Sequence, residues 1–132
     1  MYNQISHTLR SAILIPESMD LLRPVMRHWV SGVAIVTSRL GEQIHGLTAN
    51  SLVSISIEPP RVAVTLANAS LTYHLVSLSG IFAVTILADN QVELAERFAG
   101  KLFSGADRFE GVPSFTLETG APLIPGGLAY LD

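Results

Sequence analysis

The sequence contains no cysteine. A disulfide, a thiolate metal site, an iron–sulfur centre and a cysteine nucleophile are therefore all excluded. The four histidines form neither an HExxH motif nor a short His-x-His pair, which argues against a metal held by the protein. Any redox chemistry would thus require a bound organic cofactor, because none of these side chains can serve as an electron carrier.

Charge is also sparse, at 14% of residues with a net charge of -3. Lysine and arginine are scattered, so no basic surface is expected for nucleic acid. The apolar runs 33–36 and 81–84 are far shorter than the roughly 20 residues of a spanning helix. Residues 12–15 are too few for the core of a signal peptide, and Pro16 follows them. We therefore expect a cytoplasmic protein that contacts neither membrane nor nucleic acid.

Apolar residues are plentiful, at 48% of the 132 positions. A chain of this size and composition is typical of one compact domain with a large core. Residues 1–18 show no periodicity, and we interpret them as an N-terminal arm. Residues 19–132 are the expected domain.

The first periodic segment predicts a helix that Gly32 ends. Pro24 must lie in its first turn, because a proline further along would remove a hydrogen bond and clash with the preceding turn. The apolar residues recurring at three- and four-residue spacing are Leu21, Leu22, Val25, Met26, Trp29 and Val30.

A hairpin is predicted next. Residues 33–38 are rich in β-branched side chains and favour a strand, while 39–42 favour a turn into a second short strand through Ile44. Residues 61–66 alternate in a way that indicates a further strand.

Residues 46–60, GLTANSLVSISIEPP, alternate small polar and aliphatic side chains until Pro59 and Pro60. The two prolines must lie outside the hydrogen-bond ladder, because neither has an N–H to donate. The polar groups fit two interpretations. They could face water on a half-buried strand, or they could form a surface for a polar, planar ligand.

Two short helices and two strands complete the pattern. Asn68 and Ser70 are N-capping candidates for a helix with Leu71, Leu75 and Leu78 on one face. Asn90 and Glu93 have the spacing of a capping box for a second helix. That helix should turn Leu94, Ala95, Phe98 and Ala99 inward. Residues 81–87 and 128–131 favour strands.

Strands joined by hairpins, with short helices at their ends, favour a small β-barrel with helical caps. The sequence has no GxGxxG between a strand and a helix, no GxxxxGK and no GxSxG. A dinucleotide-binding fold, a P-loop and a hydrolase nucleophile elbow are therefore disfavoured.

Several short blocks, each weak alone, together resemble the flavin reductase-like family with its FMN-binding split barrel, from about Leu21 to Asp132. The blocks, in the family's order and spacing, are RHWVSGVAIVT at 27–37, HGLTANS at 45–51, PP at 59–60, IFAVTIL at 81–87, ELAERFA at 93–99, DRFEG at 107–111 and GAPL at 120–123.

The resemblance implies a mainly β, Greek-key-like split barrel with short inserted helices. Members of the family usually continue beyond the position of Asp132 through strands that close the barrel and that commonly carry a Gly-Asp-His motif. That motif is absent from this sequence. The expected fold is therefore a split barrel that is incomplete at its C-terminal side.

The implied activity is that of an NAD(P)H:flavin oxidoreductase, which reduces FMN or FAD by hydride transfer from NADH or NADPH and can supply reduced flavin to a monooxygenase. Hydride transfer needs two rings held in contact and no protein acid or base, so no catalytic side chain is assigned. The family also implies a homodimer. The alternatives are a non-catalytic or impaired flavin-binding or assembly module and, ranked lower, a split-barrel oxidase of a pyridoxamine-type substrate.

The family places the segment matching 48–51 along the flavin. The cofactor-binding residues implied by the resemblance are Gly46, Thr48, Ala49, Asn50, Ser51, Leu52, Ser54, Asn68, Ser70, Phe98, Ala99 and Lys101. Alternation along the strand predicts that Thr48, Asn50 and Ser54 face the ligand. The same alternation turns Leu52, Val53 and Ile55 into the barrel.

Each of these residues also has a purely structural interpretation. Asn68 and Ser70 either hold a flavin phosphate at the helix N-terminus or act only as caps. Phe98 could simply pack in the core, and Lys101 could either meet a phosphate or be solvated. His45 either approaches the cofactor or belongs to a turn.

Overall fold

The computed structural model describes residues 22–101 and 107–132. The chain divides into two compact units, Met1–Ser31 and Gly32–Asp132. The arm predicted over residues 1–18 lies outside the described residues, so its boundary at residue 19 stays a prediction. In the described part of the chain, no helix has the length and hydropathy that a membrane crossing requires.

The first unit contains helix α2, Leu22–Met26, with Pro24 inside its first turn as predicted. The prediction that this helix runs on to Gly32 is wrong. His28 and Trp29 donate their backbone N–H groups three residues back, to the carbonyls of Val25 and Met26, at 3.0 and 3.2 Å. Such bonds tighten the last turn of a helix and end it.

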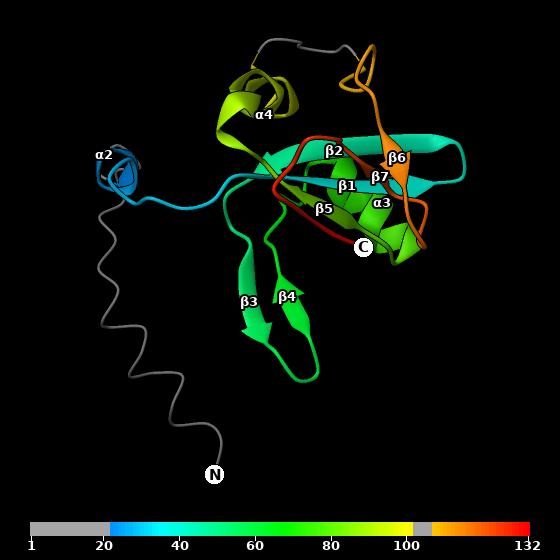
Figure 1. Ribbon diagram of the computed structural model, residues 1–132, viewed down its shortest axis with the longest axis horizontal. Helices are drawn as coiled ribbons and strands as arrows, with labels where there is room; N and C mark the ends of the chain where they lie inside the picture. The colour runs from blue at the N-terminus through cyan, green and yellow to red at the C-terminus, as the bar shows by residue number, and fades with distance from the viewer. Residues whose placement is uncertain (1–21, 102–106) are drawn as a thin grey trace. The chain divides into compact units, whose positions relative to one another are not determined.

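A four-stranded antiparallel sheet dominates the second unit (Figure 1). Its order is β2-β1-β5-β8, and its strands are β1 Ala34–Leu40, β2 Gln43–Ala49, β5 Ala83–Ile86 and β8 Ala129–Leu131. The predicted hairpin joins β1 to β2, with Gly41 at a φ of 59° in the turn. Strand β2 continues to Ala49, well past the end expected near Ile44.

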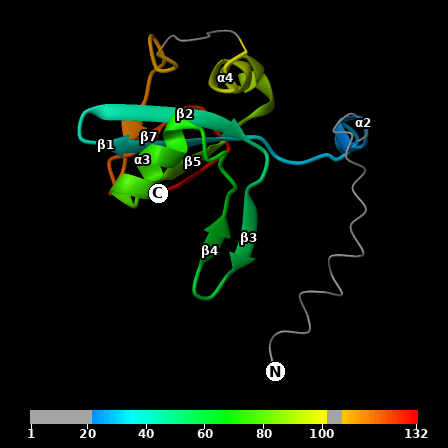
Figure 2. The ribbon, with the colours of Figure 1, turned by 180° about the vertical axis from the view of Figure 1, so that it is seen from behind.

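Strands β3, Val53–Ser56, and β4, Arg61–Ala63, form a separate hairpin that extends away from the sheet (Figures 1 and 2). Pro59 and Pro60 lie in its turn, outside the ladder, as predicted. The expectation that Val53 and Ile55 pack inside the barrel is wrong, because Val53 is 50% exposed and Ile55 is 61% exposed. Alternation assigns side chains to faces of a strand, but it does not say whether another layer covers each face. Strands β6, Phe115–Thr116, and β7, Pro122–Leu123, form another two-stranded antiparallel sheet.

Helix α3, Leu71–Ser79, begins as predicted. The Ser70 hydroxyl oxygen accepts a hydrogen bond from the backbone N–H of Tyr73 at 3.1 Å, and Gly80 ends the helix with a φ of 74°. Ser70 is thus an N-cap of the usual kind.

Helix α4, Val92–Phe98, follows a 3-10 turn, η1, over Asp89–Gln91. The predicted cap at Asn90 is wrong, because the N-cap is Gln91. The Gln91 side chain accepts from the Ala88 N–H at 3.0 Å and donates to the Pro125 carbonyl at 3.0 Å. A long-range contact therefore fixes the start of this helix one residue later than local spacing suggests.

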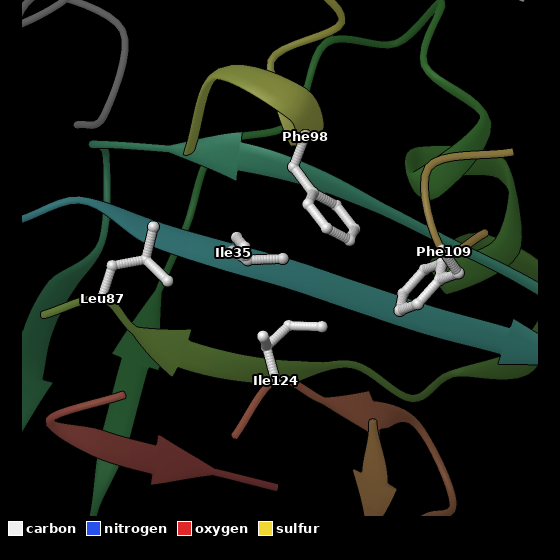
Figure 3. Close-up of a cluster of buried hydrophobic side chains, with 5 residues drawn as sticks. All are labelled: Ile35, Leu87, Phe98, Phe109 and Ile124. Atoms are coloured by element: carbon white, nitrogen blue, oxygen red, sulfur yellow. The ribbon is translucent and has the colours of Figure 1, made fainter. Parts of the chain in front are cut away.

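Both faces of β1 are buried, and each supports its own cluster. On one face, Phe98 of α4 reaches Ile35, and Leu87, Phe109 and Ile124 complete the cluster (Figure 3). Of the residues expected to point inward from α4, Ala99 is instead exposed, because it caps the C-terminal end of the helix. The cluster on the opposite face is formed by Ala34, Val36, Ala49 and Val84.

Candidate functional site

A pocket of about 340 Å³ lies beside β2, which is an edge strand of the four-stranded sheet. It is formed by the end of β2, the approach to α3, the C-terminal end of α4 and one arginine from the loop that follows. Its lining residues are Leu47, Thr48, Ala49, Asn50, Ser51, Thr65, Ala67, Ser70, Phe98, Ala99 and Arg108. Of the predicted site residues, it therefore brings together Thr48, Ala49, Asn50, Ser51, Ser70, Phe98 and Ala99.

The other predicted residues do not line this pocket. Gly46 is buried beneath it, Leu52 packs on the cluster around Ala34, and Ser54 lies in the hairpin opposite Val62. Asn68 and Lys101 are exposed.

The backbone of β2 offers hydrogen-bonding groups to the pocket. The Gly46 carbonyl accepts from Nη1 of Arg108, so it points away from β1. In an antiparallel pair, every second residue has its N–H and C=O directed away from the neighbouring strand. Thr48 therefore also turns its backbone outward, where it lines the pocket.

The two predicted hydroxyl groups in the segment 48–51 have partners within the protein. Thr48 donates through Oγ1 to the Ala95 carbonyl at 2.6 Å, which ties β2 to α4. Its proton is thus engaged inside the protein, and the role of this side chain toward a ligand stays a prediction. The Ser51 hydroxyl donates to the Thr65 carbonyl and accepts from the Thr65 N–H, both at 3.2 Å.

Asn50 differs from these two residues. Its side chain is exposed, it lines the pocket, and no hydrogen bond in the described part of the chain engages its amide. It is therefore a side chain that can donate to and accept from a ligand without breaking an internal contact.

His45 lies inside β2 and not in a turn. Its Nδ1 is 2.8 Å from Oγ1 of Thr72, which is fully buried in the first turn of α3. Burial lowers the pKa of His45, and the nearby Arg108 cation lowers it further, whereas Asp107 acts to raise it. The imidazole thus holds α3 against β2, and it does not line the pocket.

Phe98 has a core role as well as a place at the pocket. It is fully buried, and its ring meets that of Phe109 edge to face, with centroids 5.0 Å apart (Figure 3). A side chain held this firmly provides a rigid wall for the pocket.

Arg108 is the residue that sequence reasoning missed. Its Nη1 donates to the Gly46 carbonyl at 2.9 Å and to the Phe98 carbonyl at 2.7 Å, so it bridges β2 and α4. Arg108 stands in the DRFEG block that carried the family resemblance, but the resemblance assigned it no role. The lining residues Leu47, Thr65 and Ala67 were also not predicted.

The groups that line this pocket can bind a ligand through hydrogen bonds and charge. Among the described residues, no group of three or more histidine, aspartate or glutamate side chains could hold a metal ion. The pocket combines outward backbone groups, an amide, a helix N-terminus and a guanidinium. These groups suit a ligand with a polar edge and an anionic group.

Comparison with known proteins agrees with the resemblance. The model of the flavin reductase like domain matches residues 26–132. The chain is 37% identical to an actinorhodin polyketide dimerase of Streptomyces coelicolor, over 85% of the chain and 62% of the relative. It is 30% identical to reductase subunit HsaB of a flavin-dependent monooxygenase from Mycobacterium tuberculosis, over 83% of the chain and 57% of the relative.

A solved structure supports the fold. The Streptomyces globisporus NADH:FAD oxidoreductase SgcE6, in complex with NAD and FAD fragments, superposes with a TM-score of 0.77 and 33% identity. The match covers 90% of this chain and 70% of that one. The chain thus spans 62% and 57% of the length of the two curated relatives named above. The predicted mainly β fold with short helices matches the split-barrel fold of solved flavin reductases. The chain belongs to the flavin reductase-like domain family.

Proposed function

We propose that this protein is an NAD(P)H:flavin oxidoreductase whose pocket beside β2 binds FMN or FAD. One observation carries the proposal. Residues that the family resemblance selected from three separate segments of the sequence, at 48–51, at Ser70 and at 98–99, line the same pocket. A structural role for each segment alone would not require them to meet around an empty volume of ligand size.

The bound flavin would supply the ring that accepts a hydride, and the protein would bind and orient it. The outward backbone of Thr48 and the amide of Asn50 fit the polar edge of a flavin ring. The N-terminus of α3 at Ser70 fits a phosphate, because its first N–H groups lack partners within the helix. Phe98 fixes the wall on which these groups depend.

The relatives support the choice of cofactors. One solved neighbour is an NADH:FAD oxidoreductase in complex with NAD and FAD fragments, and one curated relative is the reductase subunit of a flavin-dependent monooxygenase. We extend these properties to this chain as part of the proposal. Its hydride donor is then NADH or NADPH, and a monooxygenase component is the expected recipient of reduced flavin.

A homodimer also belongs to the proposal. The β3–β4 hairpin exposes 50% of Val53, 61% of Ile55 and 90% of Ile57, although all three are aliphatic. Clustered apolar exposure of this kind is typical of an interaction surface, and most soluble homo-oligomers are twofold dimers. Sedimentation velocity at micromolar concentration should give the mass of a dimer. A monomer under those conditions would remove the dimer from the proposal.

The activity is tested by following the loss of NADH or NADPH absorbance in the presence of FMN, of FAD or of no flavin. Flavin binding is measured in parallel by quenching of flavin fluorescence. Flavin-dependent oxidation with bound flavin supports the reductase. Binding without oxidation supports the alternative, a flavin-binding or assembly module, and absence of binding contradicts both.

A further inference from the structure

A second pocket, of about 320 Å³, lies between α4, the loop after Phe109 and the segment that follows β7. Glu93, Leu94 and Arg97 line it from α4, and the remaining lining residues are 111–113 and 124–125. None of these residues lines the pocket beside β2. The volume is at the lower end of the range for sites that hold small molecules. This second volume, the α4 pocket, is therefore a separate candidate site.

Most of the wall of the α4 pocket is apolar. Ile124 is only 1% exposed and belongs to the buried cluster that contains Phe98 (Figure 3). Leu94 and Val112 are partly buried and pack against the same cluster. The two prolines of the wall have a fixed backbone φ. A wall held by core packing is already formed before a ligand enters, so burial of an apolar group against it is favourable.

Arg97 fixes the side of the α4 pocket that the loop provides. Its Nε donates to the Arg108 carbonyl at 2.8 Å, and its Nη2 donates to the Glu110 carbonyl. These two bonds attach the loop to α4 directly before Gly111, where the lining residues of the loop begin. The guanidinium is thus directed at backbone carbonyls of the fold.

Glu93 is the acidic residue of the α4 pocket. It stands in the first turn of α4, it is exposed, and no hydrogen bond or ion pair among the described residues engages its carboxylate. A carboxylate in a first turn also stabilises a helix through the helix dipole, but that role requires no pocket. Because a carboxylate can only accept hydrogen bonds, a ligand that uses Glu93 must bring a donor.

We propose that the α4 pocket binds a small molecule made of an apolar ring and a protonated amine. The ring lies against the aliphatic wall, and the ammonium group donates to the Glu93 carboxylate. An ammonium donor is favoured over a hydroxyl group because a hydrogen bond between two charged groups is the stronger one. The proposal does not rest on the proposed function, because the two pockets share no lining residue.

The test uses three probes with the same ring: cyclohexylamine, cyclohexanol and cyclohexanecarboxylate. In NMR titrations of the unmodified protein, the amine should shift the backbone amide signal of Gly111 saturably, with a dissociation constant of about a millimolar or lower. The signal of Gly41, which lies in the β1–β2 turn outside the pocket, should not move. The alcohol should bind more weakly than the amine. The carboxylate should bind most weakly, because Glu93 repels it.

Glu93→Gln keeps the size of the side chain and removes its charge. The amine should then bind about tenfold more weakly or worse, whereas the alcohol should change less than about threefold, because only the amine loses a bond between two charges. Glu96→Gln is the matched control, because Glu96 is also an exposed acid of α4 but does not line the pocket. This control should leave the binding of all three probes unchanged. The amine should also leave FMN bound.

Four outcomes would overturn the proposal. The first is the absence of saturable binding of the amine, and the second is tighter binding of the carboxylate than of the amine. The third is equal weakening by Glu93→Gln and Glu96→Gln, which would mean that the charge of α4 as a whole attracts the amine. The fourth is unchanged amine binding in Glu93→Gln with a lower urea midpoint, which would leave Glu93 with the helix-dipole role alone. Failure of the unmodified protein to bind FMN would contradict only the proposed function, because the Gly111 signal reports on the α4 pocket without flavin.

Discussion

Phe98 packs so closely against Gly46 that a Cβ added to the glycine would lie 3.0 Å from Cε1 of the phenylalanine ring. The same Cβ would lie 3.0 Å from Cγ2 of Thr37. All three residues are buried, so neither neighbour is a flexible surface side chain that can move aside. The absence of a side chain at Gly46 thus sets how closely α4 approaches β2 below the pocket.

Gly46→Ala should therefore lower the free energy of unfolding by about 1–3 kcal/mol, the usual cost of extra volume in a packed core. Urea denaturation of both proteins measures the difference. Gly32→Ala is the control, because nothing lies within 4 Å of the Cβ it would add. If the two substitutions have the same small effect, the contact between β2 and α4 is looser than described.

A second prediction concerns Thr85, which is fully buried on β5. Its Oγ1 accepts a hydrogen bond from the Ile124 N–H at 3.0 Å. Thr85→Val keeps the shape but leaves that buried N–H without an acceptor, which should cost about 1–3 kcal/mol of unfolding free energy. Thr116→Val, at an exposed position of β6, should have little effect in the same denaturation experiment. Equal stability of Thr85→Val and the unmodified protein would contradict the assigned bond.

The third prediction concerns pH. Burial and then the Arg108 charge lower the pKa of His45 below its ordinary 6.5. The unfolded chain therefore takes up a proton near pH 6.5 while folded His45 stays neutral. Stability should fall as the pH drops below that value and level off below the folded pKa. No loss from this group is expected above pH 6.5.

His45→Asn should remove this part of the pH dependence, because an amide does not titrate but can still meet the Thr72 hydroxyl. The measurement is the urea concentration at which half of each protein is unfolded, taken from about pH 5 to 8 because this range brackets the ordinary histidine pKa of about 6.5. The difference between the two curves isolates His45 from the other histidines. Parallel curves would show that His45 titrates alike in the folded and unfolded chains.

Features that depend on neighbouring residues, such as helix caps and hairpin turns, could be predicted from the sequence. Ser70 caps α3 because its side chain bonds a backbone N–H three residues away, and such a contact is visible in the sequence. The β1–β2 hairpin was likewise predictable, from a β-branched segment followed by a turn that contains Gly41. The start of α4 was not, because the side chain of Gln91 is fixed by Pro125, which is 34 residues away.

The candidate site was predictable only in part for the same reason. The family resemblance selected the segment at 48–51, but Arg108 reaches the Gly46 carbonyl across 62 residues. No spacing rule connects two such positions, which only the tertiary fold brings together. Alternation placed the Thr48 hydroxyl on the ligand side of the strand, but it could not foresee the hydrogen bond that this hydroxyl donates to the Ala95 carbonyl of α4.

The last prediction separates binding from stability at the segment that lines the pocket. Asn50 is exposed, and no hydrogen bond among the described residues engages its amide, so Asn50→Ala should leave the urea midpoint unchanged. Loss of a hydrogen bond to a neutral flavin group is worth about 0.5–1.5 kcal/mol, so the dissociation constant for FMN should rise about two- to tenfold. Riboflavin should lose affinity by a similar factor, because this contact is expected at the ring and not at the phosphate.

Two comparisons make that result interpretable. Asn90→Ala removes an exposed amide from η1, outside the pocket, and should change neither stability nor flavin affinity. Ser51→Ala also removes both hydrogen bonds to Thr65, so it should lower stability as well as affinity. If Asn50→Ala binds FMN and riboflavin as tightly as the unmodified protein does, the Asn50 amide takes no part in flavin binding. In that case the Thr48 backbone would be the remaining donor and acceptor that β2 presents to the ring, because no other residue of that strand both lines the pocket and turns its backbone away from β1.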